Sequence, residues 1–159
     1  MITGIHHTGI NVRDMARMLK FYTEGLGFEP AGEAFEWADA PLLDHIVDVP
    51  GSAARGIMLR AGSCYLELFH YSAPAPESTR PLRPHDRGYT HLCIDVTDIA
   101  QDMAHLKAAG MTFNDRDFVD MGHVKTLYGY DPEGNLIEVQ QCAPGNGMTL
   151  DDLAPINRG

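Results

Sequence analysis

Two histidines and two glutamates occur in a pattern that repeats along the chain. His7 opens the segment His7–Val12, and His91 opens the similar segment His91–Val96, 84 positions later. Glu67 and Glu138 each stand at the centre of a short aliphatic run. Imidazole and carboxylate groups together form a mixed nitrogen and oxygen ligand set that suits Zn, Ni, Co, Mn or Fe(II). The pattern predicts one divalent metal ion held by His7, Glu67, His91 and Glu138.

Alternation along the predicted strands places these four side chains on one side of a sheet. Successive strand residues point to opposite faces, so His7 points away from Ile10 and Val12, which are expected to pack on a helix. The aliphatic residues that follow His91 behave in the same way. A glutamate between aliphatic strand residues is uncommon unless it is paired or liganded. His6, the neighbour of His7, is expected to point the other way.

The elements that position these residues also repeat. Apolar spacing predicts helices over Asp14–Leu26 and Asp98–Ala109, with Asp14 and Asp98 as N-caps and glycines at the stops. The segment Asp131–Asn135 is a strong turn signal. Three strands are expected after each helix, at residues 45–49, 55–60 and 64–71 and at residues 112–119, 123–130 and 135–141. The fold class predicted is therefore α+β, with two βαβββ modules.

The modules are expected to form one domain overall. Residues 1–71 make the first module, the proline-rich residues 72–87 a linker, residues 88–142 the second module, and residues 143–159 a C-terminal tail. The first half carries about a dozen extra residues within 33–52, which include Trp37. This insert is either a substrate-facing loop or a plain surface excursion, and the sequence leaves both interpretations open.

Composition excludes several classes of function. The 159-residue chain has a net charge of −10, which argues against binding nucleic acid. No apolar run is long enough for a membrane span, and the first residues lack the features of a secretory signal, so a cytoplasmic protein is expected. Three widely spaced cysteines indicate reduced thiols.

Several of these motifs, taken in order over residues 4–141, resemble the vicinal oxygen chelate superfamily. Among its members, the chain is most similar to glyoxalase I and methylmalonyl-CoA epimerase; bleomycin-resistance proteins and extradiol dioxygenases share the fold. The resemblance implies that the modules pair, within a chain or between subunits, into a half-open, cup-shaped β-barrel with helices outside, and that the protein is a homodimer. The matching segments are His7–Val12, Phe21–Phe28, Tyr65–Leu68, His91–Val96 and Asp131–Glu138.

The resemblance also implies an activity. It indicates a divalent-metal-dependent lyase, isomerase or epimerase that moves a proton at the carbon α to a carbonyl of a small molecule, through a metal-stabilised enediolate or enolate. Glu138 is the first candidate for the base and Glu67 the second. An extradiol-type ring-cleavage dioxygenase is an alternative, although it requires one carboxylate ligand and Glu67 would be a second. A drug-binding or resistance protein of the same fold is another.

The substrate-binding candidates are His123, Tyr65, Trp37 and Lys125. Tyr65 and Trp37 are aromatic and suit an apolar part of a small substrate, whereas Lys125 suits an anionic part. His123 is both polar and aromatic. The sequence does not rank a glutathione hemithioacetal, an acyl-CoA or another carbonyl compound.

Overall fold

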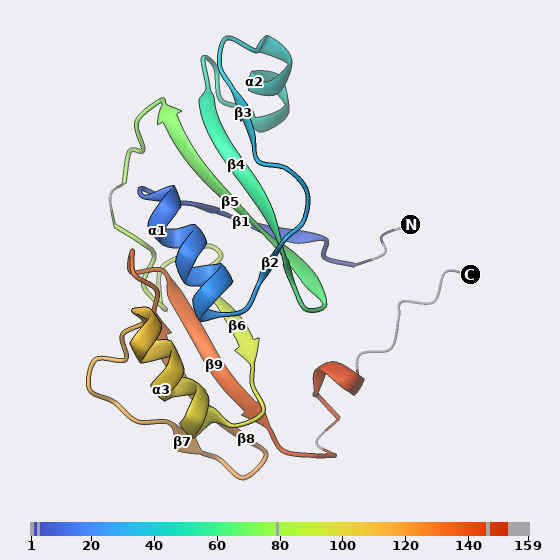
Figure 1. Ribbon diagram of the computed structural model, residues 1–159, viewed down its shortest axis with the longest axis vertical. Helices are drawn as coiled ribbons and strands as arrows, with labels where there is room; N and C mark the ends of the chain where they lie inside the picture. Colours follow the sequence, from blue (N-terminus) through green and yellow to red (C-terminus); the bar gives the residue numbers. More distant parts are fainter. Residues whose placement is uncertain (1, 3, 79, 146, 153–159) are drawn as a thin grey trace. The chain divides into compact units, whose positions relative to one another are not determined.

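The chain folds into two compact units, each built on its own sheet. The computed structural model describes residues 2, 4–78, 80–145 and 147–152 (Figure 1). The N-terminal unit begins at Ile5 and the C-terminal unit at Arg80. Each unit runs from a strand through a helix to antiparallel strands, which confirms the predicted α+β class and the βαβββ repeat. How the two modules pair stays a prediction.

In the N-terminal unit, the two strands that carry His7 and Glu67 are direct neighbours. Strands β1 (His7–Asn11), β5 (Cys64–Ala73), β4 (Ala53–Ala61) and β2 (Glu29–Pro30) lie in that order, and β3 (Phe35–Trp37) also pairs with β4. Strands β1 and β5 are parallel, and Gly9 is the partner of Glu67. Strand β4 is antiparallel to β5, with Met58 opposite Glu67.

The C-terminal unit repeats this arrangement. Its sheet has the order β6 (His91–Asp95), β9 (Leu136–Cys142), β8 (Val124–Tyr130) and β7 (Val119–Asp120). Strands β6 and β9 are parallel, with Cys93 opposite Glu138, and β8 is antiparallel to β9, with Tyr128 opposite Glu138. The parallel pairing in both units needs a crossover between the two strands, and each crossover begins with a helix.

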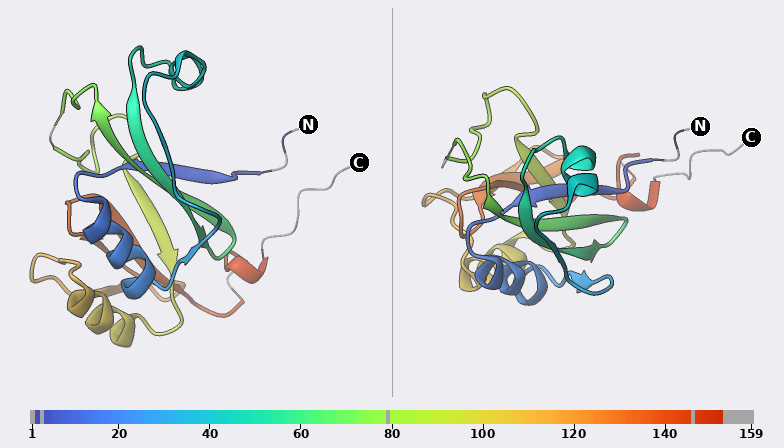
Figure 2. Two further views of the ribbon diagram at one scale, coloured as in Figure 1. Left: turned by 45° about the horizontal axis from the view of Figure 1, so that its top comes forward. Right: turned by 90° about the horizontal axis from the view of Figure 1, so that it is seen from above.

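The helices cover one face of each sheet. In Figure 1 and Figure 2, α1 (Met15–Lys20), which continues as a π-helical turn over Phe21–Gly25, lies along the sheet of the N-terminal unit, and α3 (Ile99–Ala109) lies along the other sheet. The aliphatic neighbours of the two glutamates are buried on this side: Leu66, Leu68, Ile137 and Val139 are at most 1% exposed. We call this side of each sheet the helix face, and the side that carries Glu67 or Glu138 the glutamate face.

Both predicted N-caps are confirmed. The Asp14 carboxylate accepts a hydrogen bond from the Arg17 amide at 3.0 Å, and the Asp98 carboxylate accepts one from the Gln101 amide at 3.1 Å. Gly110 ends α3 with a φ of 109°, a left-handed conformation that glycine adopts without strain. The turn before β9 forms as expected, because the buried Asp131 side chain accepts from the amides of Glu133 and Asn135.

Two strand predictions were wrong. Residues 45–49 do not form a strand, because α2 (Pro41–Val47) occupies most of this segment, with Pro41 in its first turn and Asp48 in a left-handed conformation at its end. Residues 112–119 do not form a continuous strand either: Thr112 makes an isolated bridge to Tyr130, and Val119 is the first residue of β7. Asn114 and Asp115 have positive φ angles, which interrupt an extended strand.

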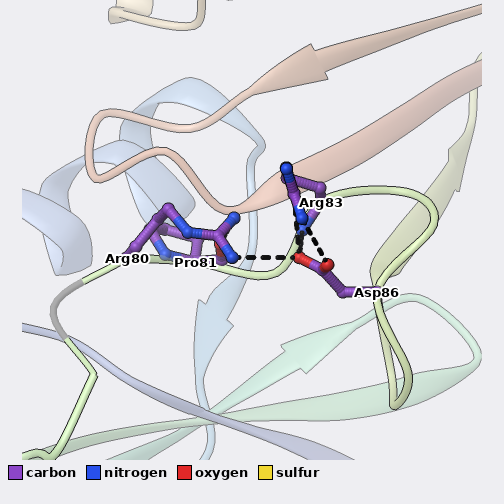
Figure 3. Close-up of polar contacts among 4 residues, drawn as sticks. All are labelled: Arg80, Pro81, Arg83 and Asp86. Carbon is purple, nitrogen blue, oxygen red and sulfur yellow. Dashed lines mark hydrogen bonds and ion pairs between the residues drawn. The ribbon is translucent and has the colours of Figure 1, made fainter.

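Hydrogen bonds and ion pairs between charged side chains hold the segment Arg80–Asp86, which follows the N-terminal unit. The Asp86 carboxylate accepts hydrogen bonds from the Arg83 amide at 2.8 Å, the Arg83 guanidinium at 3.0 Å and the Arg80 guanidinium at 3.3 Å (Figure 3). These bonds, led by that of the Arg83 side chain, hold the pKa of the Asp86 carboxyl below its usual range. The predicted linker, residues 72–87, therefore includes a fixed turn, and β5 extends into its first two residues.

The remaining predictions concern the C-terminal tail and membrane spans. Within the predicted tail, a short 3-10 helix spans Leu150–Asp152, whereas residues 146 and 153–159 fall outside the described residues. Among the residues that the structure describes, no helix is long and apolar enough to cross a membrane.

The cap of α3 leads to a prediction about stability. We expect Asp98→Ala to lower the free energy of unfolding by about 0.5–2 kcal/mol, because the amides of the first helical turn lose their acceptor. Urea denaturation followed by circular dichroism measures this. Asp98→Asn retains an acceptor oxygen and should lie close to the wild type; equal losses in both variants would contradict the role of the cap.

Candidate functional site

In the N-terminal unit, His7 and Glu67 form a pair on the glutamate face. The His7 Nε2 atom lies 3.2 Å from Glu67 Oε2, and the two side chains are 41% and 14% exposed. Gly9, the direct partner of Glu67 on β1, has no side chain that could separate them. The imidazole nitrogen and the carboxylate therefore reach the same point from neighbouring strands.

In the C-terminal unit, His91 and Glu138 form the matching pair. The His91 Nε2 atom lies 3.5 Å from Glu138 Oε2, and the side chains are 33% and 19% exposed. Here three hydroxyl groups surround the pair. The Thr126 hydroxyl donates to Glu138 Oε1 at 2.7 Å, the Tyr128 hydroxyl lies 3.4 Å from His91 Nε2, and the Thr90 hydroxyl lies 3.1 Å from His91 Nδ1.

Each pair has the spacing of two ligands on one metal ion. Two donor atoms bound to one ion at about 2.0–2.2 Å, with angles near a tetrahedron or an octahedron, lie about 3 to 3.5 Å apart. The two nitrogen–oxygen distances fall in this range. Across the described residues, no group of three or more His, Cys, Asp or Glu side chains is gathered to hold a metal, so each unit supplies two candidate ligands.

The glutamate face of the C-terminal unit is strongly acidic. Burial and the nearby charges of Glu138 and Asp95 raise the pKa of the Cys93 thiol to about 12. Burial and the charge of Glu138 also raise the pKa of the Tyr128 phenol. The Asp95 Oδ1 atom is buried and has no hydrogen-bond partner. A cation bound on this face would offset these unfavourable interactions.

His6 lies beside His7, contrary to the prediction that it points away. The two Nδ1 atoms are 2.9 Å apart, and the His6 ring stacks on Tyr65 with a centroid distance of 4.9 Å. His6 precedes β1, which begins at His7, so the alternation of a strand does not apply to it. Tyr65 thus stands close to the first pair, on the same face as Glu67.

The other substrate-binding candidates occupy different places. Trp37 lies on β3 opposite Ala54, and its ring contacts Phe69 and Tyr71 on the glutamate face. Lys125 lies on the helix face of β8, one residue out of phase with Thr126, so the structure does not bring it to Glu138. His123 is exposed just before β8, where its carbonyl accepts from the Ala143 amide.

Sequence reasoning missed Thr126 and Tyr128. Their signal is the same alternation that exposes Glu138: on the antiparallel neighbour of β9, the residue opposite Glu138 and the one two positions earlier share its face. The corresponding residues beside Glu67 are Met58 and Gly56, which offer no hydroxyl. The two pairs therefore differ in what holds the glutamate.

A separate pocket contains none of the four candidate ligands. It has a volume of about 810 Å³ and lies within the N-terminal unit. Arg55, His70 and Glu36 stand side by side across three strands in its lining. The Nδ1 atom of His70 lies 3.0 Å from the Val12 carbonyl oxygen, so this imidazole is tied to the backbone. The pocket is distinct from the candidate metal centre.

Comparison with known proteins places most of the chain in one family. Residues 4–139 match the sequence model of the Glyoxalase/Bleomycin resistance protein/Dioxygenase superfamily. A 2-epi-5-epi-valiolone epimerase from Actinomyces sp is 36% identical over 107 residues, which cover 66% of this chain and 58% of the relative. A lactoylglutathione lyase from Schizosaccharomyces pombe is 28% identical over 85% of this chain and 46% of its own length. The chain thus spans about half the length of these two curated relatives.

Solved structures share the fold. A glyoxalase family protein from Bacillus cereus superposes with a TM-score of 0.79 at 16% identity, over 89% of this chain and 95% of the other. A glyoxalase family protein from Enterococcus faecalis gives a TM-score of 0.62 at 28% identity, over 86% and 96%. A fosfomycin resistance protein, FosX from Mesorhizobium loti, is 17% identical with a TM-score of 0.53, so it shows the fold alone.

A hydrogen-bond chain through the buried Ser52 holds Trp37 and yields a testable prediction. Trp37 Nε1 donates to Ser52 Oγ at 2.7 Å, and Ser52 Oγ donates to the Asp44 carboxylate at 2.6 Å. The Ser52 hydroxyl and the Gly51 amide lower the pKa of the Asp44 carboxyl. Ser52→Ala should cost about 1–2 kcal/mol of unfolding free energy at neutral pH, because Ser52 is buried and two groups lose their partner.

Thermal or urea unfolding measures this loss, and NMR titration should find the pKa of Asp44 moved up toward its ordinary value. Because Trp37 is the only tryptophan, its fluorescence should change as well. The control is Ser72→Ala, which removes an exposed hydroxyl and should change stability by less than about 0.5 kcal/mol. Similar effects of both substitutions would contradict the stabilising role of the Trp37–Ser52–Asp44 hydrogen bonds.

Proposed function

Because the chain belongs to the Glyoxalase/Bleomycin resistance protein/Dioxygenase superfamily, we propose that it is a divalent-metal-dependent lyase or epimerase acting on a small carbonyl compound. One observation carries this proposal: the same imidazole–carboxylate pair, with donor atoms 3.2 and 3.5 Å apart, occurs on equivalent strands of both units. His7, Glu67, His91 and Glu138 would hold one ion, with the modules paired within a chain or between the subunits of a homodimer.

The names of the relatives support proton-transfer chemistry. An epimerase inverts a carbon centre, and a lactoylglutathione lyase is a second relative. Both reactions fit removal and return of a proton at a carbon next to a carbonyl. A bound divalent ion supplies Lewis acidity that makes this proton more acidic. We propose that this chain acts on the same chemical class.

The residues of the chain would then divide the work. A carboxylate must take the proton and return it, and Glu138 and Glu67 both lie partly accessible on the glutamate face. Thr126 fixes one oxygen of Glu138, which leaves the orientation of that carboxylate defined. Glu67 has Gly56 in place of a hydroxyl donor. We assign Thr126 as a positioning residue for Glu138, the first candidate for the base.

Metal content tests the ligand set. We expect untagged wild-type protein to hold about one divalent ion per chain after loading with Zn²⁺ and dialysis, and Glu67→Gln and Glu138→Gln to bind it far more weakly, since each loses a charged ligand. Elemental analysis measures the content. The matched control is Glu36→Gln, which removes a carboxylate on the opposite face of β3.

Two results would redirect the proposal. Full metal retention in Glu67→Gln, with loss in Glu138→Gln, would leave two histidines and one carboxylate and favour the dioxygenase alternative. Wild-type protein that takes up no ion from Zn, Ni, Co, Mn or Fe(II) would refute a metal enzyme and favour a binding protein of the same fold.

Deuterium exchange tests the chemistry and the role of Thr126. In D₂O, the loaded enzyme should introduce deuterium at the carbon α to the carbonyl of 2-epi-5-epi-valiolone or of a glutathione hemithioacetal, as NMR detects. Thr126→Val should lower kcat roughly 10- to 100-fold with unchanged metal content, because a hydrogen bond to a charged group contributes about 1.5–3 kcal/mol. Thr126→Ser restores the hydroxyl and should recover most of the rate.

If Thr126→Val changed KM but not kcat, or if Thr126→Ser did not recover the rate, a positioning role for the hydroxyl would be contradicted. Exchange by the wild type on neither substrate, despite a bound ion, would exclude these two substrates and turn the search to other carbonyl compounds.

A further inference from the structure

Four aromatic side chains form a continuous wall on the glutamate face of the N-terminal unit. The rings of Phe69 and Trp37 meet edge to face at 6.1 Å, those of Phe69 and Phe35 at 6.0 Å, and those of Trp37 and Tyr71 at 5.8 Å. We call Phe35, Trp37, Phe69 and Tyr71 the aromatic wall. Phe35 is 38% exposed and the other three rings are half-buried, so the wall retains apolar surface that the described residues do not cover.

The wall is continuous with the His7–Glu67 pair. Phe69 and Tyr71 follow Glu67 on β5 at intervals of two residues, so the three side chains share one face. Gly9 stands beside Glu67 on β1, and a Cβ atom added there would lie 3.7 Å from the Phe69 ring, an ordinary van der Waals contact. At Gly9, therefore, no side chain of β1 separates the Glu67 carboxylate from the wall.

The wall is fixed in position. A Cβ atom at Gly56 would lie 2.6 Å from the Phe35 ring, so glycine is needed there for Phe35 to rest on β4. On the other side, the hydrogen bond to Ser52 fixes the Trp37 indole. A wall whose rings are already held loses little conformational freedom when a ligand packs on it, which favours binding.

The described residues of the C-terminal unit form no such wall. The positions on β9 that correspond to Phe69 and Tyr71, counted from Glu138, are Gln140 and Cys142. The counterpart of β3 there is β7, which pairs with β8 in the same register and has the aliphatic Val119 in the place of Phe35. The repeat therefore folds without these rings, and their presence beside only one pair indicates a role in binding.

We propose that the substrate carries a planar apolar group, such as an aromatic ring, which packs on the aromatic wall while its oxygen atoms reach the His7–Glu67 pair. This inference rests on the proposed function and names its substrate class. The occupant is a small molecule because the apolar surface is bounded at one end by a histidine and a carboxylate, which a purely apolar protein contact would leave desolvated. Edge-to-face packing against several rings suits a planar group of about one ring.

Two hydroxamates test this inference. Acetohydroxamate and benzohydroxamate chelate a metal through the same two oxygen atoms and differ only in a methyl or a phenyl group. With Zn²⁺-loaded protein, we expect benzohydroxamate to bind roughly 10- to 100-fold more tightly by calorimetry, because only the phenyl group reaches the wall. Benzohydroxamate should also quench the fluorescence of Trp37, the only tryptophan, more strongly than acetohydroxamate.

Variants locate the preference. Phe35→Ala and Phe69→Leu should retain Zn²⁺ and reduce the preference for benzohydroxamate to less than about threefold, because part of the apolar contact is lost. Phe69 is partly buried, and its substitution could disturb the fold. Phe35 is exposed, so Phe35→Ala should leave the fold intact and serves as the second variant. The control is Phe118→Ala, which removes a ring from the other unit and should keep the full preference.

The outcomes separate this inference from the proposed function. Protein that holds Zn²⁺ but binds both hydroxamates equally, or a preference that survives in both wall variants, would overturn the inference and leave the metal site standing. Failure to hold Zn²⁺ would overturn the proposed function and the inference together. If the Trp37 fluorescence does not change with saturating hydroxamate but changes with protein concentration, a second copy of the chain covers the wall. That result would also overturn the inference.

Discussion

The organisation of each unit depends on a single constraint: a carboxylate stands in the middle of a strand whose neighbouring side chains must be buried. Leu66 and Leu68 flank Glu67, and Ile137 and Val139 flank Glu138, and all four aliphatic side chains are almost fully enclosed. A slip of one residue would carry the carboxylates into the core and the aliphatic residues into solvent, at a cost of several kcal/mol. The register of both sheets is therefore fixed strongly, and with it the face on which the ligand pairs form.

The parallel pairing of the first and last strands in each unit brings the histidine to the glutamate. A parallel pair requires a crossover, and a helix capped by Asp14 or Asp98 begins that crossover immediately after the histidine strand. The chain then returns through antiparallel strands to lie beside its starting strand. An imidazole and a carboxylate that are 60 residues apart in the first unit and 47 in the second thus become neighbours by topology.

The parts of the site that follow from strand alternation could be predicted from sequence, and the parts that depend on loops could not. The faces of His7, Glu67 and Glu138 follow from a period of two, and the caps follow from an aspartate before an apolar helix. Residues 45–49 look like a strand because Ile46, Val47 and Val49 are β-branched, yet Pro41 starts a helix that includes most of them. His6 escaped prediction because it lies just outside β1, and Thr126 because its role depends on the pairing of β8 with β9.

The two copies of the module share their backbone and differ in the side chains around the ligand pairs, which argues for a division of labour. Beside Glu138 stand hydroxyl groups, Cys93 and Asp95, a polar surface that orients a carboxylate and favours positive charge. Beside Glu67 stand glycines and aromatic rings, which leave that carboxylate without a hydroxyl donor and provide apolar surface. The proposed metal site needs only the two imidazole–carboxylate pairs, so this difference in their surroundings points to a role beyond metal binding. The substrate class that we propose, with a reactive carbonyl and a planar apolar part, would fit this difference, because its two ends need opposite environments.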